Sequence, residues 1–398
     1  MAELVYDENG RLLFTKEMKE EYTILFPTML PVHFGLMARI LETEGFHVEM
    51  LTTNHRGIVD EGLKYVHNDT CYPALLVIGQ LIDAVKSGKY DMHKVALLIT
   101  QTGGGCRASN YIHLLRKALE KAGLSYIPVI SVNLSGLEPN PGFKLGLNTL
   151  RKAVFAMMYG DIIVQTANQV RPYEVSRGQT DETIEAVETQ LLEAMNQGKG
   201  LSFKSMVANF DRIVAAFKAI PVAGEPKVRV GVVGEIYNRE VDVNIYGGKW
   251  VKKKVCQVLK GYVEKCQRAM IAAMEKGGFR APGTFEDLRR LIQGYLGEGN
   301  KMGEGWLLTA EMLELIHSGT PNIVCTQPFG CLPNHIVGKG MIRKLKDDYP
   351  FSNIVAIDYD PGATKINQEN RIKLMLANAR GLAKQEAERR EAGEAAHV

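Results

Sequence analysis

The sequence lacks long uninterrupted hydrophobic runs. Residues 153–164 are largely apolar, but Gly160 and Asp161 interrupt them, and a bilayer-spanning helix needs roughly 20 apolar residues. The first residues, MAELVYDENGR, are acidic and polar, which is unlike a secretory signal. These absences predict a cytoplasmic protein without a membrane partner.

The sequence also lacks a strong charge bias. It has 48 Lys and Arg residues against 45 Asp and Glu residues, a formal net charge of +3. Nucleic-acid-binding proteins usually carry a clear basic excess. We therefore expect no nucleic-acid partner.

Cysteine is scarce, with 6 residues among 398. So few cysteines, without a secretory signal, do not indicate a disulfide framework. In a reducing compartment they serve as core thiols, metal ligands or catalytic groups. The surroundings of each cysteine must then distinguish these roles.

A chain of this length is expected to form two or three domains. In the first third, short apolar runs alternate with stretches of helical spacing, and this alternation predicts a parallel sheet covered by helices on both faces. The runs expected to be strands are residues 22–26, 46–50, 95–100 and 127–132.

The rest of the chain divides into a helical part and a second α/β part. Residues 147–220 show no strand signal beyond IIV at 162–164, whereas strand-like runs return at 228–236 and near 323 and 354. The predicted divisions are an N-terminal α/β domain at 1–146, a helical layer or linker at 147–225, a C-terminal α/β domain at 226–380 and a charged tail at 381–398.

Three of the cysteines lie in similar sequence surroundings. Cys71, Cys106 and Cys331 each occupy a turn between an apolar run and a predicted helix. Open parallel sheets bind ligands at the carboxyl ends of their strands. We therefore expect at least Cys106 and Cys331 to lie on functional edges, one in each α/β unit.

A glycine run precedes one of these cysteines. Gly103, Gly104 and Gly105 permit positive φ angles and leave room beside the backbone for a ligand before Cys106. Their amides, with the following helix start and Arg107, favour an anion. No Lys-Ser or Lys-Thr follows the glycines, so the segment is not a P-loop. A phosphate, a thiolate and the anionic core of an iron–sulfur cluster all suit it.

Two spacings between cysteine and histidine leave zinc binding or nucleophilic catalysis open as alternatives. His67 precedes Cys71 by four residues, and Cys331 precedes His335 by four, which suits zinc ligands on one helix face. A proline in or next to each pair argues against a regular helix there. Cys331 with His335 as a base would also suffice for nucleophilic catalysis, but that leaves the other cysteine loops unexplained.

The sequence around the remaining cysteines gives weaker indications of a functional role. Cys256 and Cys266 lie ten residues apart on a lysine-rich stretch with helical spacing, so they point to different faces and are interpreted as structural. Cys325 lies within a predicted strand and remains a further candidate ligand.

Several long motifs together resemble one family, the 2-hydroxyacyl-CoA dehydratase components in the branch labelled activase-related, which are relatives of benzoyl-CoA reductase subunits and double-cubane cluster proteins. The resemblance extends from about residue 22 to 380. The motifs are PTMLPVHFGLM, DEGLKYVHNDTCYPALLVIGQ, QTGGGCRASNYIHLLRKAL, KMGEGWLLTAEMLELI, NIVCTQPFGCLPNHIVGKGMI and NIVAIDYDPGATKINQENRIKLML.

The resemblance implies two flavodoxin-like, Rossmann-like domains with an added helical layer. It implies a four-iron four-sulfur cluster between them, held by Cys71, Cys106 and Cys331, with Cys325 as a further candidate. An ATP-dependent activator of the actin-like ATPase family would supply a low-potential electron for an acyl-CoA or similar substrate. Additional cysteine ligands would allow a double cubane. A non-catalytic electron relay or regulatory partner is the alternative, and the oligomeric state is left open.

The sequence departs from this family after residue 236. GEIYNREVDVNIYGGKW continues almost directly into a lysine-rich stretch, where relatives have a further helix and strand. The second domain is therefore expected to be short of one βα unit.

Overall fold

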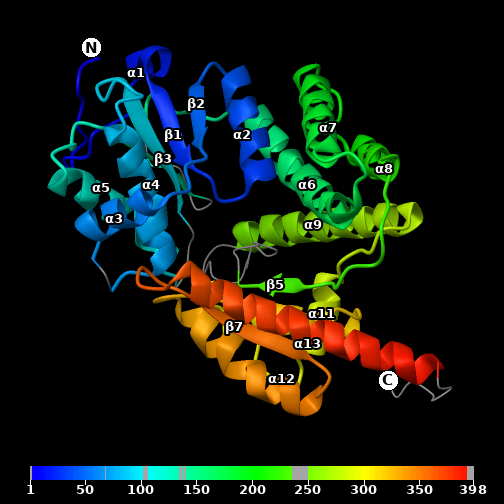
Figure 1. Cartoon of the computed structure of the whole chain (residues 1–398). Helices are drawn as coiled ribbons and strands as arrows, with labels where there is room; N and C mark the ends of the chain where they lie inside the picture. The colour runs from blue at the N-terminus through cyan, green and yellow to red at the C-terminus, as the bar shows by residue number, and fades with distance from the viewer. Residues whose placement is uncertain are drawn as a thin grey trace.

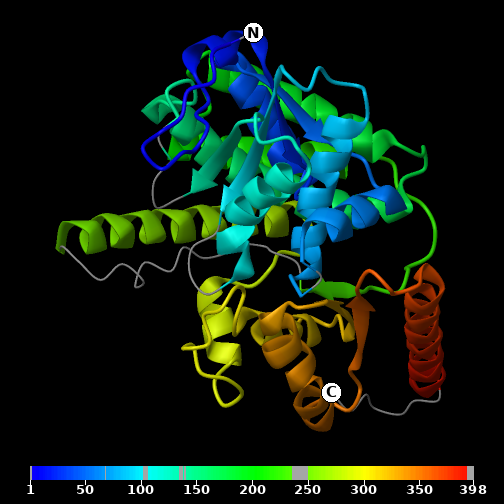
Figure 2. The ribbon, with the colours of Figure 1, turned by 90° about the vertical axis from the view of Figure 1, so that its left-hand side faces the viewer.

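The chain forms two α/β lobes with a layer of helices beside and between them (Figure 1). The view turned by 90° shows the same two lobes one above the other (Figure 2). This computed structural model describes residues 2–67, 69–101, 106–133, 138, 140–234 and 250–391.

The first lobe contains a four-stranded parallel sheet in the order β2-β1-β3-β4. This is the order of flavodoxin-like folds, in which the chain reverses direction across the sheet between β1 and β3. The predicted strands are confirmed with small shifts at their ends. They are β1 (Thr23–Pro27), β2 (His47–Leu51), β3 (Val95–Gln101) and β4 (Val129–Asn133).

Alternating residues of these strands enter two separate cores. Leu25 and Leu97 point to the face covered by α4 and α5, whereas Ile24 and Leu98 point to the face that α1 and α2 cover. Both faces are buried, which explains the near-continuous apolar runs. The helices of this lobe are α1 (Lys16–Glu21), α2 (Pro31–Thr43), α3 (Arg56–Tyr65), α4 (Tyr72–Lys86) and α5 (Tyr111–Lys121), with the 3₁₀ turn η1 (Arg107–Asn110) before α5.

Helices α3 and α4 are packed backbone to backbone. A Cβ atom on Gly62 would lie 2.3 Å from the Leu75 carbonyl oxygen, and one on Gly79 would lie 2.0 Å from that of Ile58. Glycine is therefore required at both crossing points. This contact fixes the position of α4 and of Cys71, the residue that precedes its first turn.

The helical layer has its own core, in which Tyr159, Phe210 and Met274 are buried together. The prediction left residues 162–164 as a strand candidate, and this was wrong, because they lie inside α6. Ile162 and Ile163 are fully buried in the helical core, so tertiary packing overrides their β preference. The layer comprises α6 (Leu147–Val170), the turn η2 (Arg171–Tyr173), α7 (Gln179–Asn196) and α8 (Phe203–Lys218).

Helix α9 (Trp250–Gly277) lies against this layer rather than on the second sheet (Figure 1). Its residues Cys266, Met270 and Met274 share the core of α6 and α8. By packing, the helical layer therefore includes α9, which lies within the predicted domain 226–380 along the chain.

The second lobe contains a parallel sheet in the order β5-β6-β7. Among the described residues this sheet has the order of the first one without a counterpart of β2. Residues 235–249, on which the expected shortage of one βα unit depends, lie outside the described residues. The strands of this lobe are β5 (Gly231–Val233), β6 (Asn322–Pro328) and β7 (Asn353–Tyr359). Its helices and turns are α10 (Phe285–Leu291), α11 (Leu307–His317), η4 (Asn334–Gly338), η5 (Lys339–Met341), α12 (Ile342–Asp348) and α13 (Lys365–Glu391).

The charged tail continues a helix. Helix α13 packs against β7 through Met375 and extends to Glu391, so the described part of the predicted tail 381–398 is helical. In the described ranges, no helix combines the length and the apolar character that crossing a membrane requires.

Candidate metal centre between the two sheets

The three candidate cysteines lie on loops that meet between the lobes. Cys71 precedes α4, Cys106 follows β3, and Cys331 follows β6. The backbone N–H of Tyr72 donates to the carbonyl oxygen of Phe329 at 2.8 Å. Loops separated by more than half the chain are thus joined directly at the carboxyl edges of the two sheets, where such folds bind ligands.

Gly330 allows this close approach. Its φ angle is +71°, a left-handed conformation that residues with a Cβ atom adopt only at a cost. A Cβ atom at this position would also lie 3.0 Å from the Cα atom of Cys71. Both the turn and the contact with the first lobe therefore require glycine.

A third loop joins the Cys106 and Cys331 segments. The Cβ position of Gly303 lies 3.9 Å from the Cys106 sulfur and 3.1 Å from the Pro333 ring. Arg107 is exposed and its guanidinium donates to the backbone carbonyl of Asp69. Arg107 thus ties the Cys106 loop to the Cys71 loop.

The thiols influence one another electrostatically. Burial raises the pKa of Cys106, and the nearby acidic groups Glu304, Cys331 and Cys71 raise it further. Burial likewise raises the pKa of Cys331, with further contributions from Glu304 and Cys71. A bound cation reverses this effect and deprotonates coordinating thiols. The site therefore favours neutral thiols until positive charge enters it.

Each of the three sulfur atoms has a hydrogen-bond partner. Cys71 Sγ lies 3.1 Å from the Tyr111 hydroxyl. The other two partners are donors, the backbone N–H of Ala108 to Cys106 Sγ at 3.5 Å and Asn334 Nδ2 to Cys331 Sγ at 3.1 Å. Hydrogen bonds to ligand sulfurs tune iron–sulfur clusters. The three thiols and their partners therefore fit such a cluster.

Sequence reasoning missed Tyr111, Asn334 and Glu304. Tyr111 is almost fully buried, and burial first and then Cys71 raise the pKa of its phenol; it therefore stays a neutral donor. The only sequence signal was proximity to a cysteine for Tyr111 and Asn334. Glu304 had a different signal, a carboxylate between two glycines in KMGEGW.

Of the other predicted ligand-binding residues, the structure places Cys325 but not the glycines of the Cys106 loop. Gly103, Gly104 and Gly105 lie outside the described residues. Cys325 is fully buried in the core of the second lobe, and its sulfur accepts a hydrogen bond from Gln327 Nε2 at 3.0 Å.

The two cysteines interpreted as structural lie on α9. Cys266 is buried in the core of the helical layer. The side chain of Cys256 falls outside the described residues. Cys71 also belongs to the core of the first lobe and Cys106 packs against that core, so position on the meeting loops distinguishes them from Cys266 and Cys325.

The structure also places the two histidines that the sequence offered as zinc ligands. His67 is exposed and pairs with Asp69, while the backbone N–H of His335 donates to the Cys331 carbonyl at 3.2 Å in a helical turn. No three His, Cys, Asp or Glu side chains of the described residues are grouped for a single metal ion. The ligands of a cubane bind different irons, so their sulfurs are spread more widely than ligands of one ion.

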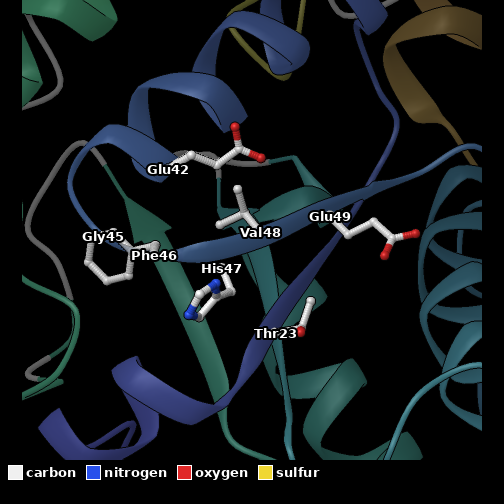
Figure 3. Close-up of a pocket in the computed structure, with 7 residues that line it drawn as sticks. All are labelled: Thr23, Glu42, Gly45, Phe46, His47, Val48 and Glu49. Carbon is white, nitrogen blue, oxygen red and sulfur yellow. The ribbon is translucent and has the colours of Figure 1, made fainter. Parts of the chain in front are cut away.

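An open hollow lies at the opposite edge of the first sheet (Figure 3). It has a volume of about 470 Å³, and Thr23 and His47, the first residues of β1 and β2, are among its lining residues. This is the amino edge of the sheet, so the hollow is separate from the cysteine loops.

Comparisons with protein-family models, curated proteins and solved structures find no match for this chain. What the protein does must therefore be argued from its motifs and from the geometry of the cysteine loops.

Proposed function

We propose that Cys71, Cys106 and Cys331 hold a four-iron four-sulfur cluster in an oxygen-sensitive redox protein of the 2-hydroxyacyl-CoA dehydratase type. The observation that carries this proposal is the meeting of three cysteine loops across the facing edges of two sheets, joined by the Tyr72–Phe329 hydrogen bond. The motifs around these loops suggest the family, and the hydrogen-bond partners of the sulfurs support the choice of ligands.

When bound, such a cluster accepts one electron, and three thiolates leave one of its irons without a cysteine ligand. The chain supplies three thiols that release their protons on metal binding. Tyr111, Asn334 and the Ala108 amide are placed to stabilise the resulting negative charge. The low exposure of Cys71, at 5%, limits access of water.

A single cluster is favoured over a double cubane. A double cubane needs further cysteines, yet Cys325 and Cys266 are buried in two other cores. The expected electron donor is an ATP-dependent activator of the actin-like family. The expected acceptor is an acyl-CoA thioester or a similar substrate that is hard to reduce.

A non-catalytic electron relay is the second candidate. The short sheet of the second lobe favours it, because a missing βα unit would remove part of the cleft wall in which a substrate binds. Adding an acyl-CoA to the reduced protein separates the two: a changed EPR spectrum supports the enzyme, and an unchanged one supports the relay.

The test of the cluster is anaerobic purification or reconstitution, followed by iron and sulfide analysis and EPR after reduction. We expect about four irons per chain. Cys106→Ser should lower the iron content strongly, whereas the matched core variant Cys266→Ser should retain it. Stoichiometric zinc, absence of metal from the wild type, or full iron in Cys106→Ser would contradict the proposal.

A further inference from the structure

Glu304 lies in a loop whose shape is fixed by two glycines. Gly303 and Gly305 have φ angles of +59° and +55°. A Cβ atom on Gly305 would lie 1.9 Å from the Asn300 carbonyl oxygen, and the same oxygen accepts a hydrogen bond from the Trp306 amide at 2.9 Å. The backbone on both sides of Glu304 is therefore held in one conformation.

This loop lies against the cysteine site. Gly303 approaches the Cys106 sulfur and the Pro333 ring, as described above. The negative charge of Glu304 contributes more than the neighbouring cysteines do to raising the pKa values of Cys106 and Cys331, after the larger effect of burial. The loop contact of Gly303 and these electrostatic effects together place Glu304 close to Cys106 and Cys331.

The Glu304 carboxylate has no cationic partner among the residues that the structure describes. Burial raises its pKa, and a hydrogen bond from its own backbone N–H opposes that shift. Buried charges are normally paired or coordinate metals, because an uncompensated one is costly. A half-buried carboxylate next to the loops of Cys106 and Cys331 is therefore suited to a metal centre.

We propose that Glu304 is the fourth protein ligand of the cluster, with a carboxylate oxygen on the iron that Cys71, Cys106 and Cys331 leave without a thiolate. The inference rests on the proposed function. A carboxylate is a harder donor than a thiolate and matches the soft cluster iron less well. It would therefore make one iron chemically distinct and more readily exchanged than the other three.

The test compares anaerobically reconstituted wild type with Glu304→Gln, which keeps the shape of the side chain and removes its charge. Glu286→Gln is the matched control, because Glu286 is 81% exposed in the same lobe. Iron and sulfide analysis is followed by Mössbauer spectroscopy of ⁵⁷Fe-labelled protein. We expect about one quarter of the iron to form a distinct site whose parameters change in Glu304→Gln and stay unchanged in the control.

The outcomes separate the two proposals. Absence of iron from the wild type overturns the cluster itself. Full iron content with identical spectra in wild type and Glu304→Gln leaves the cluster standing and overturns the ligand. If Glu304→Gln loses its iron, Glu304→Asp decides: iron retained with aspartate supports a ligand role, and iron lost from both variants overturns it.

Discussion

The edge of the two sheets and the interiors of the lobes use cysteine in different ways. At the edge, Cys71, Cys106 and Cys331 each precede a helical segment. Burial raises the pKa of Cys106, and the other two thiols raise it further. In the interiors, Cys266 and Cys325 are packed among apolar side chains of two separate cores. The residue type is the same, and only the position in the fold differs.

Burial alone does not separate the two groups. Cys71 is 5% exposed, close to the values of 1% for Cys266 and 0% for Cys325. What separates the two groups is the presence of other thiols close enough to act on them electrostatically. A thiol within a core stays neutral, whereas a thiol in a group can share a cation.

The largest effect is expected from Gly330→Ala, which would force the Cys331 loop away from Cys71. The left-handed conformation and the close contact together should lower the free energy of unfolding by roughly 2–5 kcal/mol, and iron content should fall. Gly88→Ala is the control, because Gly88 has a φ angle of +76° with no atom within 4 Å of its Cβ position. It should lose stability but keep iron; equal iron in both variants would contradict the prediction.

An intermediate effect concerns a core thiol and pH. Burial raises the pKa of Cys325 from 9.0 to about 11. The folded state thus holds this proton more tightly than the unfolded state, so the stabilisation is complete below pH 9 and is lost as pH rises through 11. In iron-free protein, the stability advantage of wild type over Cys325→Ala should shrink by about 2 kcal/mol between pH 9 and pH 11.

Denaturant unfolding at several pH values measures this difference. Groups common to both proteins cancel in the comparison, which isolates the contribution of the thiol. A pH-independent difference would mean that Cys325 is not held as a neutral thiol in the core.

The smallest effect is expected from Tyr111→Phe, which removes the hydroxyl next to the Cys71 sulfur. Loss of one such hydrogen bond should lower the reduction potential of the reconstituted cluster by tens of mV, because the donor stabilises the more negative reduced state. Tyr159→Phe is the control: its hydroxyl bonds to Gly200 and Asn209 in the helical layer. It should affect stability only, and equal potentials in all three proteins would contradict the role of Tyr111.

Local signals explain which parts of the fold were predictable. The strands of the first sheet are continuous apolar runs between helical repeats, and the capping box at Thr284 with Asp287 marks the start of α10. The IIV segment at 162–164 misled the prediction because three β-branched residues fit a strand as well as a buried helix. Only the packing partners of α6 decide between them.

The candidate site was predictable in part for the same reason. Cys106 and Cys331 follow apolar runs directly, so their place at a sheet edge can be read from neighbouring residues. Glu304 and the contact of Tyr111 with Cys71 could not be read in this way, since they depend on contacts between distant segments.

The sequence by itself determined the elements, the alternation that makes two parallel sheets, and the position of three cysteines at element ends, because these depend on residues close together in the chain. Only the tertiary structure decided that the two carboxyl edges face each other, that Cys325 turns into a core, and that the Glu304 loop lies against the loops of Cys106 and Cys331. The physical reason is that the contacts of Gly303 with Cys106 and of Gly330 with Cys71 act between segments far apart along the chain.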